Sequence, residues 1–221
     1  VTVGVCLSGC GVQDGSEIHE AVCTLLALEQ AGAHIECFAP DIEQADVVDH
    51  VKGNPIPGKA RNVLIESARI ARGKIRPLSR ASAMDLDALI FPGGFGAAKN
   101  LCSFAHDGTE CTVQPEVERL INEMIDEKKP VGFICIAPVI AARIYGARDL
   151  QPVLTIGTDA DTASAIETMG GTHQPCDATE VAIDETNKLV STPAYMLAGG
   201  PSEVYAGVSK LVREVLRIAK A

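Results

Sequence analysis

Pro130-Val-Gly-Phe-Ile-Cys135 is the stretch that decides the fold, because this apolar run passes directly into the helix-like segment from Ile136 to Tyr145. A short apolar run bounded by Pro predicts a buried strand. A strand that ends in a nucleophile and continues as a helix is typical of a nucleophile elbow, a sharp turn that exposes one side chain at the sheet edge. Free N–H groups at the helix start favour thiolate. We therefore predict that Cys135 is reactive; a buried structural cysteine is the alternative.

Strand-like and helix-like segments alternate on both sides of this stretch. The predicted strands are Val1 to Leu7, Ala33 to Ala39, Asp87 to Phe91 and Leu154 to Ile156, with a hairpin formed by Val181 to Asp184 and Lys188 to Thr192. The predicted helices are Glu17 to Gln30, Asn62 to Arg72, Pro115 to Glu127, Thr162 to Met169 and Ser202 to Lys220. This alternation predicts one α/β domain over residues 1–221, with a mainly parallel sheet and helices on both faces. The polar segments near 41–60 and 101–114 are predicted insertions, the first with a hairpin around Asp46 to Val51.

Three predicted strands end in unusual sequences, namely Ser8 to Gly15, Pro92 to Gly96, and Cys135. In a parallel sheet these ends share one edge, where ligands bind. Gly93 and Gly94 fit a tight turn whose N–H groups face a developing oxyanion, although a plain turn explains them too. The first of these loops reads G-x-G-x-x-x-G, one residue longer than a dinucleotide fingerprint, so that match is weak.

Two carboxylates follow the first loop. Glu17 with Asp14 fits a capping box, and Glu17 and Glu20 both complement the dipole of the helix they begin. The functional alternative is a carboxylic acid that hydrogen-bonds the Cys135 sulfur, with a raised pKa suited to proton transfer. Cys10 either lines the same pocket or fills the turn, and the sequence does not distinguish the two positions.

Composition restricts the partners. The chain has a formal net charge of -10 and only 4% aromatic residues, which argues against nucleic-acid binding. It has no apolar run long enough to span a membrane, and its first residues read as a strand, so no membrane partner is expected. The eight cysteines show no metal-ligand spacing. They indicate free thiols in a reducing compartment, which we predict to be the cytoplasm.

Two motifs carry a family resemblance. Phe91-Pro-Gly-Gly-Phe-Gly-Ala-Ala-Lys-Asn-Leu101 and Gly132-Phe-Ile-Cys-Ile-Ala-Pro138 resemble the paired signatures of the ThiJ/PfpI superfamily, relatives of class I glutamine amidotransferases. More narrowly, the segments from Leu7 to Glu20, from Arg61 to Gly73 and from Thr192 to Leu197 are similar to the ElbB family, also called enhancing lycopene biosynthesis proteins or isoprenoid biosynthesis glyoxalases.

The resemblance implies a flavodoxin-like fold, a homodimer and a site without cofactor or metal. It implies that Cys135 is the nucleophile, that Glu20 and not Glu17 is its acidic partner, and that the N–H groups of Gly94 and Ile136 hold the oxyanion. Many proteases and amidotransferase relatives of the superfamily have a histidine directly after the cysteine or further along the chain, where this chain has Ile136 and Gly157-Thr-Asp159. This difference counts against a peptidase or a glutaminase.

The sequence thus predicts a cofactor-independent glyoxalase, which converts a small aldehyde such as methylglyoxal or glyoxal to a 2-hydroxy acid through the Cys135 thiolate. The resemblance links this activity to isoprenoid biosynthesis. A redox-sensing or regulatory thiol is one alternative, because it also requires an accessible cysteine of low pKa. An amidotransferase-like hydrolase is the other.

Overall fold

The computed structural model describes residues 1–221, and its centre is a seven-stranded sheet with the order β10-β11-β7-β6-β1-β2-β5. Six strands run parallel, and β10 pairs antiparallel with β11 at one edge. The strands are β1 (Thr2–Cys6), β2 (His34–Ala39), β5 (Ile75–Pro77), β6 (Ala88–Phe91), β7 (Val131–Ile134), β10 (Ala182–Asp184) and β11 (Leu189–Thr192). The predicted mainly parallel sheet is confirmed, together with its terminal hairpin.

The strand order reverses between β1 and β6. From β1 the sheet continues to β2 and β5, and from β6 it continues to β7 and β11. The carboxyl ends of β6, β7 and β11 lie level, because Phe91 pairs with Phe133 and Ile134 pairs with Thr192. The loops that follow β1, β6 and β7 therefore meet at one edge, beside the point where ligands bind in open α/β sheets.

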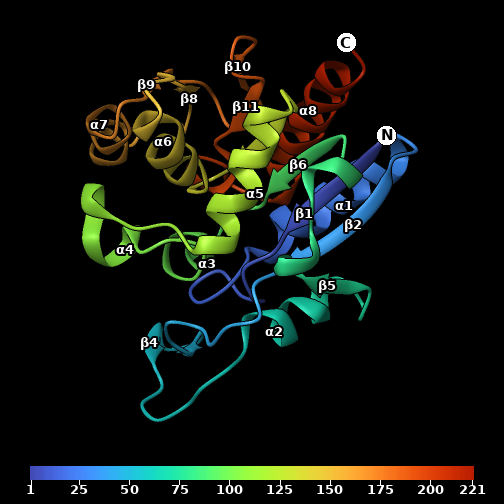
Figure 1. Ribbon diagram of the computed structural model, residues 1–221. Helices are drawn as coiled ribbons and strands as arrows, with labels where there is room; N and C mark the ends of the chain where they lie inside the picture. Colours follow the sequence, from blue (N-terminus) through green and yellow to red (C-terminus); the bar gives the residue numbers. More distant parts are fainter.

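Helices cover both faces of the sheet (Figure 1). The first hydrophobic core joins one face to α1 (Ile18–Gln30), α2 (Val63–Ile70) and α8 (Pro201–Ala219). The second core joins the opposite face to α5 (Pro115–Asp126) and α6 (Pro138–Ala147). Strands β6 and β7 are buried along their whole length, as expected for central parallel strands between two helical layers. This is the predicted doubly wound, flavodoxin-like architecture.

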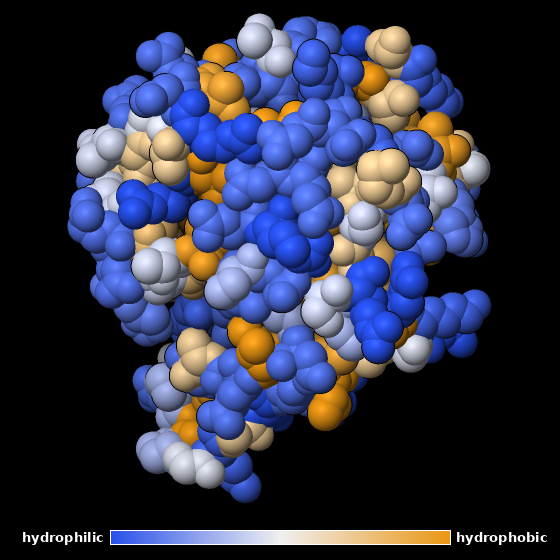
Figure 2. Space-filling model, viewed as in Figure 1, coloured by the Kyte–Doolittle hydropathy of each residue, from blue (hydrophilic) through white to orange (hydrophobic).

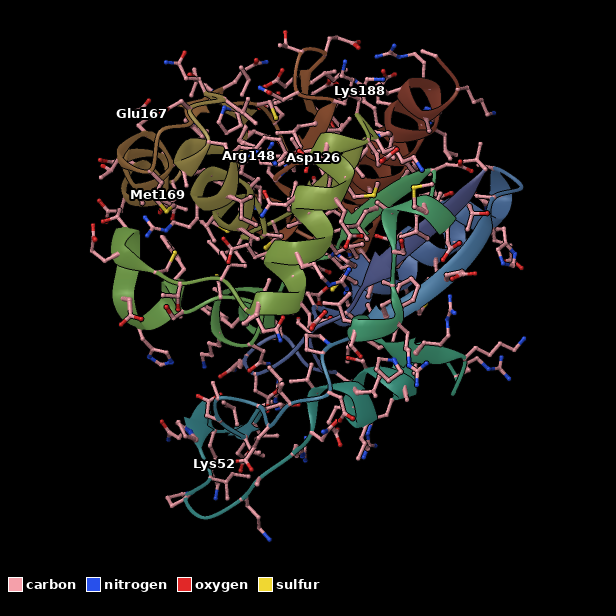
Figure 3. All side chains as sticks on the ribbon, in the orientation of Figure 1. Lys52, Asp126, Arg148, Glu167, Met169 and Lys188 are labelled. Carbon is pink, nitrogen blue, oxygen red and sulfur yellow. The ribbon has the colours of Figure 1, made fainter.

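Residues 41–62 form a lobe that projects from the sheet (Figure 1). It holds a hairpin of β3 (Val48–Asp49) and β4 (Asn54–Pro55), a few residues after the predicted hairpin position. The lobe is tied to the loop after β1, because Asp14 Oδ2 accepts a hydrogen bond from the Val48 N–H at 2.8 Å. Lys52 lies on this hairpin (Figure 3).

Two other segments lie outside the main sheet. Residues 101–114 follow α3 (Phe95–Lys99) and contain α4 (Phe104–Asp107) and the short η3 turn (Gly108–Glu110). Residues 153–173 contain β8 (Val153–Leu154), α7 (Ala160–Thr168) and β9 (Thr172–His173). The strand predicted at 154–156 therefore exists only in part, and it pairs with β9 in a separate two-stranded sheet.

The face shown in Figure 2 is mostly hydrophilic, with small, scattered hydrophobic spots. Asp126 at the end of α5 and Arg148 after α6 lie side by side there (Figure 3), with 2.7 Å between Oδ1 and Nη2. Such an exposed ion pair contributes little to stability. Three more 3-10 turns complete the structure, at η1 (Leu78–Arg80), η2 (Ala83–Asp85) and η4 (Ala194–Met196).

Candidate active site

Cys135 stands at a sharp turn between β7 and α6. Its backbone has φ +63°, a left-handed conformation that is uncommon for a residue other than glycine and concentrates at functional sites. Its N–H donates to the Thr192 carbonyl at 2.9 Å, which fixes the turn against the end of β11. Helix α6 begins at Pro138, two residues later than predicted. The predicted strand–cysteine–helix turn is present, and it leaves the Cys135 side chain 8% exposed.

Glu20, on the first turn of α1, is completely buried beside this turn. Its Oε2 accepts a hydrogen bond from the Gly93 N–H at 3.0 Å, and its Oε1 accepts one from the Tyr195 N–H at 3.2 Å. Its carboxyl also hydrogen-bonds the Cys135 thiol. Burial, with a smaller contribution from the charge of Glu17, raises the pKa of Glu20 to about 8. Glu20 therefore meets Cys135 with the raised pKa that the sequence predicts.

The pKa of the Cys135 thiol is also raised, first by burial and then by the charge of Glu20. The N–H groups of Gly94 and Ile136 hydrogen-bond the sulfur and lower this pKa, but they do not outweigh burial. The N–H groups at the helix start therefore act in the predicted direction, toward thiolate, but removal from water opposes the buried charge more strongly, so the thiol is the resting form. Thiolate formation requires that Glu20 hold the proton, since two adjacent buried anions repel each other strongly.

Close contacts with neighbouring atoms leave room only for glycine at positions 93 and 94. A Cβ on Gly93 would lie 2.4 Å from the Cys135 Cβ and 2.6 Å from the Glu20 Oε2. Gly94 has φ +94°, and a Cβ there would lie 2.3 Å from the Glu17 nitrogen. The turn after β6 therefore brings its backbone directly against both Cys135 and Glu20. The plain-turn explanation does not account for this approach.

Glu17 caps α1 and faces the site. Its Oε2 accepts a hydrogen bond from the Glu20 N–H at 2.7 Å, while its own N–H donates to the Gly93 carbonyl at 2.9 Å. Asp14 takes no part in this cap, because its carboxylate binds the lobe at Val48. The predicted capping box of Asp14 and Glu17 is therefore wrong: Glu17 occupies the cap position itself.

A cavity of about 410 Å³ adjoins Cys135. Its walls are mostly apolar and come from the loop after β1, from α3, α4 and α7, and from η4. The lining residues are Val12, Glu17, Gly94, Phe95, Ala98, Phe104, Ala105, Cys135, Ile136, Asp159, Thr162, Tyr195 and Met196. Glu20 is not among them, so it contacts the sulfur from beneath the cavity floor.

Cys10 does not line this cavity. It is partly exposed on the other side of the loop after β1, near the charged groups of Glu66, Arg69 and Arg61. Of the two positions that the sequence left open, the structure places Cys10 in the turn, away from Cys135. It does not join the site because the loop turns it toward α2.

The glycine-rich loop after β1 uses its N–H groups within the protein. Gly9 donates to the Ser67 Oγ at 2.8 Å, Gly11 to the Ser16 carbonyl at 3.0 Å and Gly15 to the Gly11 carbonyl at 2.7 Å. A dinucleotide site needs such groups free to bind the pyrophosphate. These N–H groups instead close the loop on itself and join it to α2.

The structure adds one pair that sequence reasoning missed. The Nδ1 atom of His19, on the first turn of α1, lies 2.6 Å from the hydroxyl oxygen of Tyr195, which lines the cavity. The two residues are 176 positions apart. The motif from Thr192 to Leu197 contains Tyr195 and is the only sequence signal for the pair, because no local pattern relates Tyr195 to His19.

No group of three or more His, Cys, Asp or Glu side chains in the structure is arranged to hold a metal ion. None of the helices has both the length and the apolar character needed to span a membrane.

Comparison with known proteins gives clear relatives, although no family model matches the chain. The chain is 47% identical over 225 residues to human glutamine amidotransferase-like class 1 domain-containing protein 3, mitochondrial; the match covers 98% of the chain and 82% of that protein. The crystal structure of an isoprenoid biosynthesis protein with an amidotransferase-like domain from Ehrlichia chaffeensis has a TM-score of 0.91, 36% identity and 99% coverage of both chains. Drosophila melanogaster DJ-1beta, at 15% identity and a TM-score of 0.54 over 99% and 95% of the two chains, shares the fold alone.

The relatives overturn the predicted cytoplasmic location. The human, rat and zebrafish proteins are all named as mitochondrial, which points to mitochondria. The eight free cysteines indicate reducing surroundings, but they do not identify which reducing compartment is involved.

Identity of this extent over nearly the whole chain, with the close superposition on the Ehrlichia protein, establishes the family. The chain belongs to the glutamine amidotransferase-like class 1 family that includes the ES1 proteins and ElbB-like isoprenoid biosynthesis proteins, and it has the DJ-1/ThiJ/PfpI fold.

Proposed function

We propose that this protein is a cofactor-independent glyoxalase that converts 2-oxoaldehydes to 2-hydroxy acids with Cys135 as the nucleophile. The observation that carries the proposal is the hydrogen-bonded pair of the Cys135 thiol and the Glu20 carboxyl at the floor of an apolar cavity. A nucleophile paired with a group that accepts its proton is the arrangement that covalent catalysis requires.

In the first step the Glu20 carboxylate takes the thiol proton and the sulfur adds to the aldehyde carbon C1. The C1=O electron pair moves to oxygen, where the N–H groups of Gly94 and Ile136 stabilise the oxyanion. Glu20 then returns the proton to this oxygen, which gives a neutral hemithioacetal. Because the pKa of Glu20 is about 8, a fraction of the protein carries the required carboxylate at neutral pH.

In the second step Glu20 removes the proton from C1, the C–H electron pair forms a C1=C2 double bond, and the C2=O electron pair moves to the C2 oxygen, which takes up a proton to give an enediol. Return of a proton to C2, with loss of the proton from the C1 hydroxyl, gives the thioester of a 2-hydroxy acid. Water then hydrolyses the thioester and the Cys135 thiol is restored. The sum is one 2-oxoaldehyde and one water converted to one 2-hydroxy acid, with no external oxidant or reductant.

The cavity suggests the kind of aldehyde. Its apolar walls, with Phe95, Phe104 and Met196 among them, offer far more contact than the methyl group of methylglyoxal uses. The Ehrlichia relative is named as an isoprenoid biosynthesis protein. Both observations favour a 2-oxoaldehyde with a larger apolar substituent, aliphatic or aromatic, and we extend the link to isoprenoid metabolism to this chain on that basis.

Two alternatives have less support. A redox-sensing thiol requires an accessible cysteine of low pKa, whereas the Cys135 pKa is raised and its side chain is 8% exposed. A glutaminase of the amidotransferase type uses a histidine as the base beside the cysteine, and the residues that line the cavity include no histidine.

The test is 2-hydroxy acid formation from methylglyoxal and phenylglyoxal by purified protein. We expect lactate and mandelate from the wild type, and neither from Cys135→Ala or Glu20→Gln. Cys23→Ala, which removes a partly buried thiol from α1, is the matched control and should retain activity. Absence of both products from the wild type, or full activity in Cys135→Ala, overturns the proposal, and a glutaminase assay on the same preparation tests the amidotransferase alternative.

A further inference from the structure

We propose that Tyr195 is a second acid–base group of this site, which donates a proton to the C2 oxygen of the substrate, and that His19 positions Tyr195 and relays protons to it from solvent. This inference rests on the proposed glyoxalase function. Tyr195 would supply the proton at the end of the substrate that Glu20 does not reach.

The two side chains are held together at the cavity wall. The Tyr195 hydroxyl lies 2.6 Å from the His19 Nδ1, a short distance for a hydrogen bond between oxygen and nitrogen. Their ring centroids are 5.7 Å apart at an angle of 45°. Tyr195 lines the cavity and is half-buried, whereas His19 is exposed. A proton path therefore leads from bulk water through His19 to the hydroxyl of a residue that lines the cavity.

The backbone of Tyr195 is fixed to the catalytic pair. Its N–H donates to the Glu20 Oε1 at 3.2 Å. The preceding residue, Ala194, has φ +44°, a strained conformation for a residue with a side chain. The turn is closed by a hydrogen bond from the Met196 N–H to the Pro193 carbonyl at 3.0 Å. The strained turn thus sets the Tyr195 side chain at a defined position relative to Glu20 and Cys135.

Glu20 alone does not serve both ends of the substrate. It is completely buried beneath the cavity, and each carboxyl oxygen already accepts a backbone hydrogen bond. It is suited to atoms next to the sulfur, namely the thiol proton and the proton on C1. The C2 oxygen lies one carbon farther from the sulfur, toward the cavity, and needs a group from the wall.

Among the polar groups of the wall, Tyr195 fits this role best. Glu17 is committed to the cap of α1 through its bond to the Glu20 N–H. Asp159 caps α7, and its hydrogen bonds from Thr162 lower its pKa, which leaves it ionised and without a proton to give. Burial and nearby negative charges raise the pKa of Tyr195, so its hydroxyl keeps the proton that an acid must supply.

The proton balance is complete. When Glu20 removes the C1 proton, the C2=O electron pair moves onto the C2 oxygen, which takes the hydroxyl proton of Tyr195. The imidazolium form of His19 returns a proton to the Tyr195 oxygen, and water reprotonates His19. The new O–H remains as the hydroxyl of the 2-hydroxy acid, while the C1 hydroxyl proton is released to solvent when the thioester forms.

The experiment compares Tyr195→Phe and His19→Gln with Tyr205→Phe, whose hydroxyl bonds Gln30 on the exposed surface. With phenylglyoxal and its 1-deuterated form, we expect Tyr195→Phe to lower kcat about 100-fold with little change in KM, and to raise the isotope effect on kcat because C1–H cleavage becomes slower. His19→Gln should lower kcat and raise the isotope effect to a smaller extent. Tyr205→Phe should change neither kcat nor the isotope effect.

A purely structural role for Tyr195 would reduce the active fraction and leave the isotope effect unchanged, which would overturn the inference. Unchanged kcat in Tyr195→Phe would also overturn it while leaving the glyoxalase proposal in place. No product from the wild-type protein would overturn both. Thermal unfolding of each variant establishes that the comparison is made between folded proteins.

Discussion

The Gly93 N–H donates a hydrogen bond to the Glu20 Oε2 at 3.0 Å, and a Cβ added to Gly93 would lie only 2.4 Å from the Cys135 Cβ. The backbone of the turn after β6 thus lies directly against both Glu20 and Cys135. Three chain segments far apart in the sequence meet at this point, and the contact leaves no space for a side chain.

Gly93→Ala is expected to damage both stability and activity. The added methyl must displace Cys135, Glu20 or the β7 backbone, which costs roughly 1–3 kcal/mol of unfolding free energy. Urea denaturation and the 2-hydroxy acid assay measure the two effects. Gly200→Ala is the control, because a Cβ on Gly200 meets no atom within 4 Å. Equal unfolding free energies of the two variants would show that the turn after β6 accommodates the added methyl group without loss of stability.

Cys135→Ser should lose turnover by about 10³-fold or more while it keeps the fold. The hydroxyl is a much weaker nucleophile than a thiol at neutral pH, and the smaller oxygen fits the same turn. The rate of 2-hydroxy acid formation and the melting temperature check the two halves of this prediction. Activity within a few-fold of wild type would exclude a covalent role for Cys135.

Glu20→Gln should lower the pKa of the Cys135 thiol. Burial, the largest cause of the raised pKa, is unchanged in this variant, but the charge and the hydrogen bond of Glu20 both raise it and are removed. The rate of Cys135 alkylation by iodoacetamide, followed by peptide mass spectrometry across a pH series, measures the shift. Cys176 in the same protein is the internal reference, because its pKa is set by burial and by Thr155. A higher alkylation rate together with lost turnover would support the proposed pairing of Glu20 with Cys135. An unchanged alkylation profile would contradict an effect of Glu20 on the Cys135 pKa.

Glu20 should also make the protein less stable as pH rises from about 4.5 to about 8. The folded protein keeps the Glu20 proton up to a pKa of about 8, whereas the unfolded chain releases it near the ordinary value of 4.5. The folded state therefore binds more protons in this window, so its stability falls with pH by up to about 1.4 kcal/mol per unit. Urea unfolding of wild type and Glu20→Gln across this range tests the prediction, and parallel curves for the two proteins would refute it.

The apolar cavity predicts a preference for larger substrates. The kcat/KM for phenylglyoxal should exceed that for methylglyoxal by about tenfold or more, because the ring gains contacts that a methyl group does not make. Phe104→Ala should reduce this preference and leave methylglyoxal turnover nearly unchanged, since Phe104 lines the cavity and is only partly buried. Equal specificity constants in the wild type would assign the cavity another role.

Much of the fold was predictable because the hydrophobic pattern is regular. The buried runs before Cys135 and before Gly93 read clearly as central strands, and the alternation with helices gave a parallel sheet. Strand β5 was not predicted because it is only three residues long and contains Arg76 and Pro77. The strand near Leu154 was predicted without its partner, since a short apolar run does not indicate which neighbour it pairs with.

The site was predictable where its residues belong to a local motif. Cys135 follows a strand, Glu20 lies in the first turn of a helix and Gly94 follows another strand, so topology alone brings them to one edge. The pair of His19 and Tyr195 depends on a contact across 176 positions, and the raised Cys135 pKa depends on how completely the fold excludes water. Neither property is encoded in a short stretch of sequence.

The exposed residues Ala105 to Asp107 lie between two halves of the site in the sequence. Everything that Glu20 and Gly93 contribute comes before them, and everything that Cys135 and Tyr195 contribute comes after. A chain divided there yields two fragments, neither of which holds Cys135 together with Glu20. If the proposed activity is present, its recovery on mixing the two fragments would measure directly how many molecules have reassembled.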